Sequence, residues 1–457
     1  MNKLNTPYVF FLGIGGIGMS AMARYFLVKG RSVMGYDKTP SGITEKLTQE
    51  GALVVYDDQW NEAFEALTPE NCLVVYTPAI PKNATLMLEF HKRAFSLVKR
   101  AETLGMVTRF EKSIGVAGTH GKSTTSAMLA FLLSETPHKC NAFLGAIATN
   151  FDSNYLFSDK AEFTVMEADE FDRSFLFLAP FAGIVTSVDP DHLDIYETAD
   201  KFHEGFRQYA MKIDPRGVLV VREGIALPGL CKKVSYALES TTADYVGINL
   251  VEGAQGISFT LKTPKGVFND IHIGIHGQHN AENAVAALAL CAELGLELPS
   301  IIPHFSRFQG IKRRFEMVYQ SDNLVFIDDY AHHPTEISRL IESVKAMFPN
   351  LPIAGVFQPH LFSRTKDFAQ GFAEALAGLD QLFLLPIYPA RELPISGIDS
   401  PWLLSKIRME KKQCVTPAAL MPLLRDFNQG VLLTLGAGDI DRLVPAIKEL
   451  LIANENE

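Results

Sequence analysis

The chain has 457 residues, of which 47% are hydrophobic, so it exceeds one ordinary core and predicts about three domains of ~150 residues. Its 42 basic and 52 acidic residues give a formal net charge of −10, which argues against a nucleic-acid-binding surface. Five scattered cysteines without a CxxC pair predict neither a disulfide framework nor a zinc site. Because no apolar stretch reaches the ~20 residues of a membrane span, we expect a cytoplasmic protein that binds no membrane.

The N-terminal segment opens as a βαβ unit. We expect an apolar strand over residues 8–12, then the run GIGGIGM and a helix, then a strand over 32–36 that ends at Asp37. Three glycines fit the GxGxxG pattern, which lets backbone approach a diphosphate: Gly13, Gly15 and Gly18. Asp37 falls where an acidic residue commonly meets a ribose. The pattern fits a nicotinamide cofactor and a nucleotide-sugar diphosphate equally.

A further strand is expected at the start of residues 73–81, ending in a turn at the carboxyl edge of the same sheet. Ligands of open α/β sheets bind at this edge. Thr77 therefore either holds a substrate or caps the turn, and the sequence does not choose between the two.

A phosphate-binding loop is the most informative motif of the chain. Residues 115–133 read as a buried strand, the glycine-rich turn GTHGKST and an apolar helix. Backbone N–H groups freed by Gly118 and Gly121 can point at a polyphosphate, Lys122 supplies positive charge, and the Ser123 hydroxyl suits magnesium. The common pattern has glycine where Val116 stands, so the loop is a variant. We expect ATP as its ligand, the alternative being a turn that only caps a helix.

Two later strands of this segment end in acidic clusters. A strand over 163–166 leads into Glu167, Asp169, Glu170 and Asp172, and a strand over 184–188 leads into Asp189, Asp191, His192 and Asp194. Because parallel strands end at the edge that carries the phosphate loop, we expect Glu167 and His192 to complete the shell of magnesium bound to ATP. The alternative, a solvated acidic loop, suits the outlying Glu170 and Asp172.

Polar residues also stand near the end of the second segment and at the strand ends of a third. Asn280 and Asn283 stand at the start of an alanine-rich helix, where they either contact a base or act as caps; their spacing favours caps. The cluster Lys312, Arg313 and Arg314 either clamps phosphates or forms a solvated hinge. Repeated strand, loop and helix units then predict a second Rossmann-like domain. Its strands are expected to expose these residues at their ends: Asp328, Asp329, Tyr330, His332, His333, His360 and Arg364.

The motifs taken together resemble the Mur ligase family of peptidoglycan synthesis. The motifs occur in the family's order and approximate spacing, over nearly the whole chain. They are GIGGIGM, GTHGKSTT, EADE, DHLD, HNAENA, RRFE, DDYAHHPTE, FQPHxxxRT and GAGD. The resemblance implies an α/β protein of three domains. These are a Rossmann-like domain for the UDP-sugar (1–106), a P-loop ATPase domain with a mainly parallel sheet (107–315), and a Rossmann-like domain that receives an amino acid (316–457).

The resemblance also implies a reaction. The γ-phosphate of ATP passes to the lactyl carboxylate of UDP-N-acetylmuramate, and the amine of L-alanine attacks the resulting acyl phosphate. GIGGIGM would then hold the substrate's diphosphate instead of a dinucleotide cofactor. We expect a monomer or weak homodimer. Two rivals are a sister ligase that attaches a preformed peptide to the same sugar, and a nucleotide-binding protein without catalytic activity.

Residue roles follow from the family motifs. The resemblance implies Lys122, Glu167 and His192 as catalytic residues and Ser123, Glu167 and His192 as magnesium ligands. The implied ATP-binding residues are Gly118, Thr119, His120, Gly121, Lys122, Ser123, Thr124, Asn280, Asn283, Arg314 and Asp329. The implied UDP-sugar-binding residues are Gly13, Gly15, Gly16, Gly18, Asp37 and Thr77. The implied amino-acid-binding residues are Tyr330, His332 and Arg364.

Two departures limit this transfer. Many relatives have an arginine where Leu361 stands, so only Arg364 is carried over as a carboxylate-binding cation. Some sister ligases use a carbamylated lysine, but neither Lys201 nor Lys212 matches that position, and the role stays unassigned.

Overall fold

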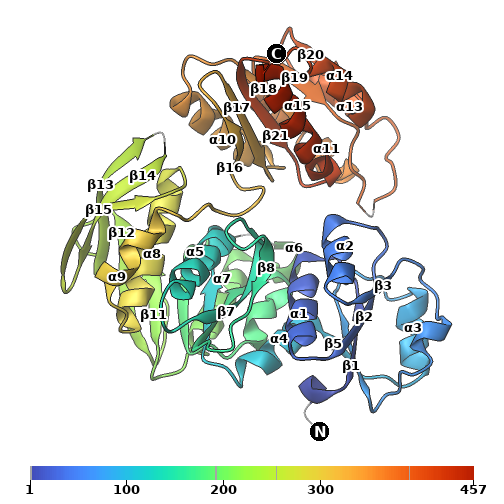
Figure 1. The fold of residues 1–457 in the computed structure, drawn as a ribbon, viewed down its shortest axis with the longest axis vertical. Coiled ribbons are helices and arrows are strands. Elements are labelled where there is room, and N and C mark those ends of the chain that lie inside the picture. The colour runs from blue at the N-terminus through green and yellow to red at the C-terminus, as the bar shows by residue number, and fades with distance from the viewer. Residues whose placement is uncertain (1–2, 191–192, 254, 391, 457) are drawn as a thin grey trace. The chain divides into compact units, whose positions relative to one another are not determined.

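The computed structural model describes residues 3–190, 193–253, 255–390 and 392–456. The chain forms two compact units, Met1–Gly310 and Ile311–Glu457. The first unit contains two sheets and the second contains one (Figure 1). The α/β class expected from the sequence is confirmed in all three sheets.

The first sheet is fully parallel, with strand order β3-β2-β1-β4-β5. Its strands are β1 (Tyr8–Leu12), β2 (Ser32–Tyr36), β3 (Leu53–Val55), β4 (Cys72–Tyr76) and β5 (Leu97–Lys99). Its helices are α1 (Ile17–Val28), α2 (Gly42–Gln49), α3 (Thr85–Lys92) and α4 (Arg100–Thr108). The strand order reverses at β1, so the glycine run after β1 lies where open α/β sheets bind ligands.

The second sheet has ten strands in the order β15-β14-β13-β12-β11-β10-β6-β9-β7-β8. Its pairs are parallel from β13 to β7, and antiparallel pairs close both edges. The strands are β6 (Ser113–Ala117), β7 (Cys140–Ala148), β8 (Ser153–Leu156), β9 (Phe163–Ala168), β10 (Ala182–Val185), β11 (Val218–Arg222), β12 (Lys232–Leu238), β13 (Tyr245–Gly253), β14 (Gly256–Thr263) and β15 (Gly266–Ile273). The helices are α5 (Lys122–Ser134), α6 (Leu193–Tyr196), α7 (Ala199–Ala210), α8 (Gln278–Glu293) and α9 (Leu298–Phe305).

Strand β10 ends at Val185, although the sequence predicted a strand that reaches residue 188. The next residues instead form a loop, in which the hydroxyl of Thr186 donates to the carbonyl of His120. An apolar β-type run does not reveal that its last residues serve a neighbouring loop, which explains the error.

The sheet of the second unit has the order β16-β17-β21-β18-β19-β20 and is parallel except for the β16–β17 pair. Its strands are β16 (Glu316–Gln320), β17 (Leu324–Asp329), β18 (Ile353–Phe357), β19 (Gln381–Leu384), β20 (Lys412–Cys414) and β21 (Gly430–Leu435). Its helices are α10 (Pro334–Met347), α11 (Phe362–Asp367), α12 (Ala369–Leu376), α13 (Ser400–Lys406), α14 (Pro417–Leu423) and α15 (Val444–Asn456). Both faces of this sheet carry a buried apolar cluster, as expected of a parallel sheet.

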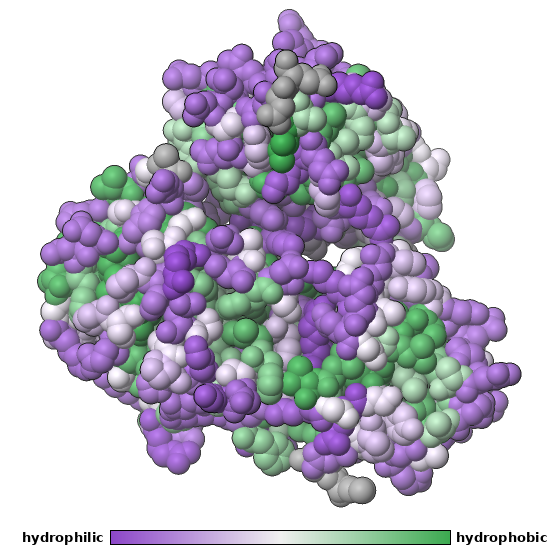
Figure 2. Space-filling view, viewed as in Figure 1, coloured by the Kyte–Doolittle hydropathy of each residue, from purple (hydrophilic) through white to green (hydrophobic). Residues whose placement is uncertain are grey.

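Hydrophilic residues cover most of the visible surface of each unit, with hydrophobic ones in smaller groups between them (Figure 2). None of the helices in the described ranges is both long and apolar enough to cross a membrane. The domain boundaries at 106 and 315 stay a prediction, because the first two sheets belong to one compact unit.

Candidate active site

The phosphate loop joins β6 to α5 and contains the two glycines singled out in the sequence. Gly118 has φ 141° and Gly121 has φ 81°, both in the range that favours glycine. A Cβ atom on Gly118 would collide with the Thr186 hydroxyl, and one on Gly121 would lie 2.7 Å from Oδ1 of Asn283. The loop therefore needs glycine at both positions for its backbone path and for its close neighbours.

The loop after β10 holds the phosphate loop from one side. The His120 N–H donates to the Ser187 hydroxyl at 2.9 Å, and the Thr119 hydroxyl donates to the Asp189 carbonyl at 2.7 Å. Gly121 is the N-cap of α5 and has no side chain to bond the first-turn N–H groups. These groups are thus available to an anion, as at other phosphate-binding helix starts.

Lys122 lies beside the loop and forms a buried ion pair. Its Nζ donates to the Gly118 carbonyl at 2.6 Å and lies 2.8 Å from Oε2 of Glu170. Glu170 is only 1% exposed, and its carbonyl accepts a hydrogen bond from the Tyr196 hydroxyl. Burial raises the pKa of Glu170, while the charge of Lys122 opposes this rise. The interpretation of Glu170 as an outlying solvated carboxylate is therefore wrong, because it is the counter-ion of the loop lysine.

Asp172, which shared that interpretation, is partly exposed and has an ion-pair partner. It lies 2.9 Å from Nζ of Lys99, in the strand that precedes α4. The neighbouring Asp169 pairs at 3.9 Å with Arg100, the first residue of α4. The acidic loop after β9 is thus tied to the first sheet by two cations.

Glu167 occupies the end of β9, as the sequence predicted, and faces the phosphate loop. Its Oε1 accepts a hydrogen bond of 2.6 Å from the Gly145 N–H, and the Ser123 side chain bonds the same carboxyl group. Burial raises its pKa, and Lys122 opposes this effect. A Cβ on Gly145 would lie 2.6 Å from the carboxyl carbon, so a side chain there would displace the Glu167 carboxylate.

Ser123 and Glu167 together offer one hydroxyl and one carboxylate, both hard oxygen donors that suit magnesium. Glu167 keeps an oxygen that does not accept from Gly145, so the donor set fits a cation that is also held by nucleotide phosphates. In the part of the chain that the structure describes, no three His, Cys, Asp or Glu side chains cluster as a metal site of their own. His192, the third expected ligand, lies outside the described residues.

A cavity of about 410 Å³ connects the two glycine-rich motifs of the first unit. Its lining includes the first turn of α1 (residues 16–18), Thr77, Arg100, Lys122 and Glu167. The expected UDP-sugar turn and the expected ATP loop therefore open into the same space. Arg100 was missed in the sequence; the signal was a basic pair, Lys99 and Arg100, at the end of a short strand.

The remaining N-terminal site residues shape the glycine turn. Asp37 accepts a hydrogen bond of 2.8 Å from the Gly15 N–H, and a Cβ on Gly15 would lie 2.9 Å from that carboxylate oxygen. A Cβ on Gly13 would lie 2.7 Å from the Thr77 methyl group. Thr77 accepts a long bond, 3.4 Å, from the Ala79 N–H and also lines the cavity, so both interpretations of Thr77 keep support.

Asn280 and Asn283 are buried in the first two turns of α8, and the interpretation that they are caps is wrong. The N-cap is Gly277, and Asn280 donates its Nδ2 hydrogen to the His276 carbonyl at 2.6 Å. Asn283 instead approaches Gly121 of the phosphate loop. This position leaves Asn283 available to a nucleotide bound at the loop.

In the second unit, the basic cluster has divided roles. Arg313 donates to the carbonyls of Gly436 and Gly438 and lies 3.7 Å from Asp328, so it is neither a solvated hinge nor a free phosphate clamp. The Arg314 guanidinium lies over the Tyr330 ring at 5.6 Å. Asp329 accepts hydrogen bonds from the Phe315 and Ala331 N–H groups at 2.6 and 2.7 Å.

The expected amino-acid residues gather around His360. The ring of His332 lies 5.2 Å from that of Tyr330 and 6.2 Å from that of His360, and Arg364 bonds Nδ1 of His360 at 3.2 Å. Burial, aided by the charge of Arg364, lowers the pKa of His360 to about 4, so this imidazole is neutral at pH 7. Leu361, beside it, has φ 70°, a strained value for a residue with a branched side chain.

Replacing Gly121 by alanine should weaken ADP binding by at least tenfold, because the added methyl group displaces Asn283 or the loop. Calorimetric titration of ADP measures the effect. Gly224→Ala is the matched control: Gly224 has a similar φ, 86°, but open space around it. The free energy of unfolding of this variant should fall by about 1 kcal/mol, and its affinity for ADP should not change. Equal ADP affinities for the two variants would contradict the assignment.

Glu170→Gln should bind ADP several-fold more tightly. The neutral amide removes a negative charge beside the phosphate site and frees Lys122 from its ion pair. The gain should be larger without magnesium, when the diphosphate charge is unshielded. Glu162→Gln, at the opposite end of β9 and paired with Lys112, is the control. Weaker ADP binding by Glu170→Gln would show that Glu170 instead aids nucleotide binding.

Known proteins resemble this chain along its whole length. Three family models match in succession: the Mur ligase family catalytic domain (residues 8–112), the Mur ligase middle domain (116–291) and the Mur ligase glutamate ligase domain (313–438). A UDP-N-acetylmuramate–L-alanine ligase of Parabacteroides distasonis is 45% identical over 99% of this chain and 98% of its own length. Another ligase of the same name, from Phocaeicola vulgatus, is 45% identical over 97% of this chain and 98% of its own length.

A solved structure shares the fold. The crystal structure of a UDP-N-acetylmuramate–alanine ligase from Thermotoga maritima aligns with a TM-score of 0.81 and 24% identity, over 98% of this chain and 99% of that one. The full-length matches agree with the order of the sheets and with the phosphate loop beside Lys122 and Glu167. The chain belongs to the Mur ligase family.

Proposed function

We propose that this protein is the ligase that joins L-alanine to UDP-N-acetylmuramate at the expense of ATP, in peptidoglycan precursor synthesis. The 45% identity to relatives of that name, over nearly the full length of both chains, carries the proposal. The geometry supports it, because one cavity is lined both by the glycine turn after β1 and by Lys122 and Glu167.

The reaction requires two transfers. An oxygen of the lactyl carboxylate attacks the γ-phosphorus of ATP, ADP leaves, and an acyl phosphate forms. The amine of L-alanine then attacks the acyl carbon, and phosphate and a proton leave from the tetrahedral intermediate. Activation is needed because a free carboxylate does not react with an amine at a useful rate.

The expected site residues of both units have tasks in this scheme. The N–H groups at the start of α5 and the ammonium of Lys122 bind the polyphosphate and stabilise charge on the transferring group. Asn280, Asn283, Arg314 and Asp329 contact the nucleotide. The turn after β1 binds the UDP-sugar diphosphate, with Arg100 as a further cation on the cavity wall. Exclusion of water protects the acyl phosphate from hydrolysis.

Magnesium would be held by Ser123 and Glu167, with His192 as the third protein ligand that the family motif implies. When bound, it offsets negative charge on the phosphates and the attacking carboxylate. The hydroxyl of Ser123 and the carboxylate of Glu167 already lie side by side.

The amino acid would bind in the second unit, at Tyr330, His332 and Arg364. Arg364 suits the carboxylate of L-alanine, and the neutral His360 orients the guanidinium through its 3.2 Å contact. We further propose that residues 1–106, 107–315 and 316–457 form the domains for UDP-sugar, ATP and amino acid. The three family models, which match 8–112, 116–291 and 313–438, support these boundaries.

The purified protein should release phosphate from ATP only when magnesium, UDP-N-acetylmuramate and L-alanine are all present. A coupled phosphate assay measures this, with glycine, L-serine and a preformed tripeptide as alternative acceptors. Reactions that lack the sugar nucleotide are the control. Turnover with the tripeptide alone would assign the chain to the sister ligase, and tight NADH binding without sugar-nucleotide binding would exclude ligase activity.

Lys122→Ala should lower kcat by at least about a hundredfold, because a preorganised charge on the transferring phosphoryl group is lost. Lys112→Ala is the matched control. Lys112 directly precedes β6, the strand that leads into the phosphate loop, and it pairs with Glu162 at the surface. The same coupled assay compares the two variants. Near-normal turnover of Lys122→Ala would show that its role is misassigned.

A further inference from the structure

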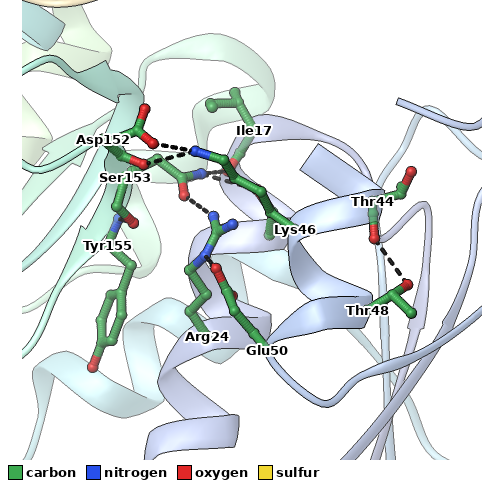
Figure 3. A network of polar contacts seen from close by, with 11 residues as sticks. Ile17, Arg24, Thr44, Lys46, Thr48, Glu50, Asp152, Ser153 and Tyr155 are labelled. Carbon is green, nitrogen blue, oxygen red and sulfur yellow. Dashed lines mark hydrogen bonds and ion pairs between the residues drawn. The ribbon is translucent and has the colours of Figure 1, made fainter. Parts of the chain in front are cut away.

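A polar network joins the first sheet's helices to a hairpin of the second sheet, within the first unit (Figure 3). The hairpin consists of β7 and β8, paired antiparallel through Ala142–Leu156 and Phe143–Tyr155. It contacts α1, which begins directly after the glycine turn of the expected diphosphate site. The buried part of the network, Asn154, Ser20 and Arg24, therefore packs against the helix that follows the turn.

Asn154 of β8 is the centre of this network. It is fully buried, and its Nδ2 donates to the carbonyl of Ile17 at 2.5 Å and to the hydroxyl of Ser20 at 2.9 Å. Its Oδ1 accepts a hydrogen bond from the Arg24 guanidinium. Reversing the amide would place oxygen against the Ile17 carbonyl and NH₂ against Arg24, so the side chain has one stable orientation.

Arg24 fixes that orientation from the other side. It is 6% exposed, and its Nε lies 2.8 and 3.0 Å from the two carboxylate oxygens of Glu50, which follows α2. Because the Arg24 guanidinium is buried, leaving it unpaired is costly, so its contacts with Glu50 hold it in place. Lys46 and Asp152 form a second ion pair nearby, but both are solvent-exposed.

The other strand of the hairpin reaches the reacting centre. The register of β7 and β8 shifts between Phe143 and Ala148, and within this irregular stretch Leu144 and Gly145 line the cavity. The Gly145 N–H holds Glu167 at 2.6 Å. One hairpin thus bonds Glu167 through β7 and the first turn of α1 through β8.

The geometry points to Asn154 as a positioning residue that fixes the diphosphate-binding turn at a set distance from Glu167 and Lys122. This inference rests on the proposed function, in which that turn binds the UDP-sugar. Ile17 and its neighbours Gly16 and Gly18 line the cavity, so a shift of the first turn of α1 moves the diphosphate and the attached lactyl carboxylate. The phosphate loop makes no hydrogen bond to Asn154 among the described contacts and should keep its shape.

Asn154→Asp is the decisive variant. It keeps the size of the side chain and the oxygen that pairs with Arg24, but it removes both donors and sets a negative oxygen against the Ile17 carbonyl. The rings of Tyr25, Phe143 and Tyr155 still pack together and should keep the hairpin in place. Steady-state kinetics should show a KM for UDP-N-acetylmuramate raised at least fivefold, with the KM for ATP and the Kd for ADP within twofold of wild type.

Lys46→Ala is the matched control, because it removes the exposed ion pair of the same interface, and its constants should equal those of wild type. Ser20→Ala removes one partner of Asn154 and should raise the same KM by a smaller factor; it decides the question if Asn154→Asp does not fold. Equal increases in the KM for UDP-N-acetylmuramate and the KM for ATP, or no change in either, would overturn the positioning role. A wild-type protein that releases no phosphate would instead overturn the proposed function.

Discussion

The arrangement of the site depends on one electrostatic constraint: a lysine ammonium lies among carboxylates at the edge of a sheet. Lys122 pairs with Glu170, and its charge also opposes the effect of burial on Glu167. Buried carboxylates without such a cation would repel each other and take up protons. A polyphosphate brings further negative charge, so the site can accept it only together with cations. This charge balance supports the proposed role of magnesium in the reaction.

Parallel strands are the reason that these charges meet. β6, β9 and β10 are neighbours or near neighbours in one sheet, and their carboxyl ends carry the phosphate loop, Glu167 and the loop of Thr186. Residues separated by about fifty positions in the chain thereby come within hydrogen-bonding distance. The same principle in the first sheet places the turn after β1 beside Thr77 after β4.

Local patterns in the sequence were enough to predict β1 and β2 at their observed bounds, the phosphate loop, and Glu167 at the end of its strand. They failed where a residue's environment depends on distant segments. Glu170 reads as one more surface carboxylate, but it contacts Lys122 and Tyr196, which lie 48 and 26 positions away in the chain. Asn283 reads as a cap because nothing in its own helix indicates that Gly121 packs against it. The link between Asn154 and Ile17 spans 137 positions and leaves no local pattern.

Gly145 has a consequence for inhibitor design. Any side chain at this position would place its first carbon 2.6 Å from the carboxyl carbon of Glu167. A compound that rests on the backbone of Gly145 in the cavity would therefore contact a surface that a side chain at position 145 could change only by displacing the Glu167 carboxylate.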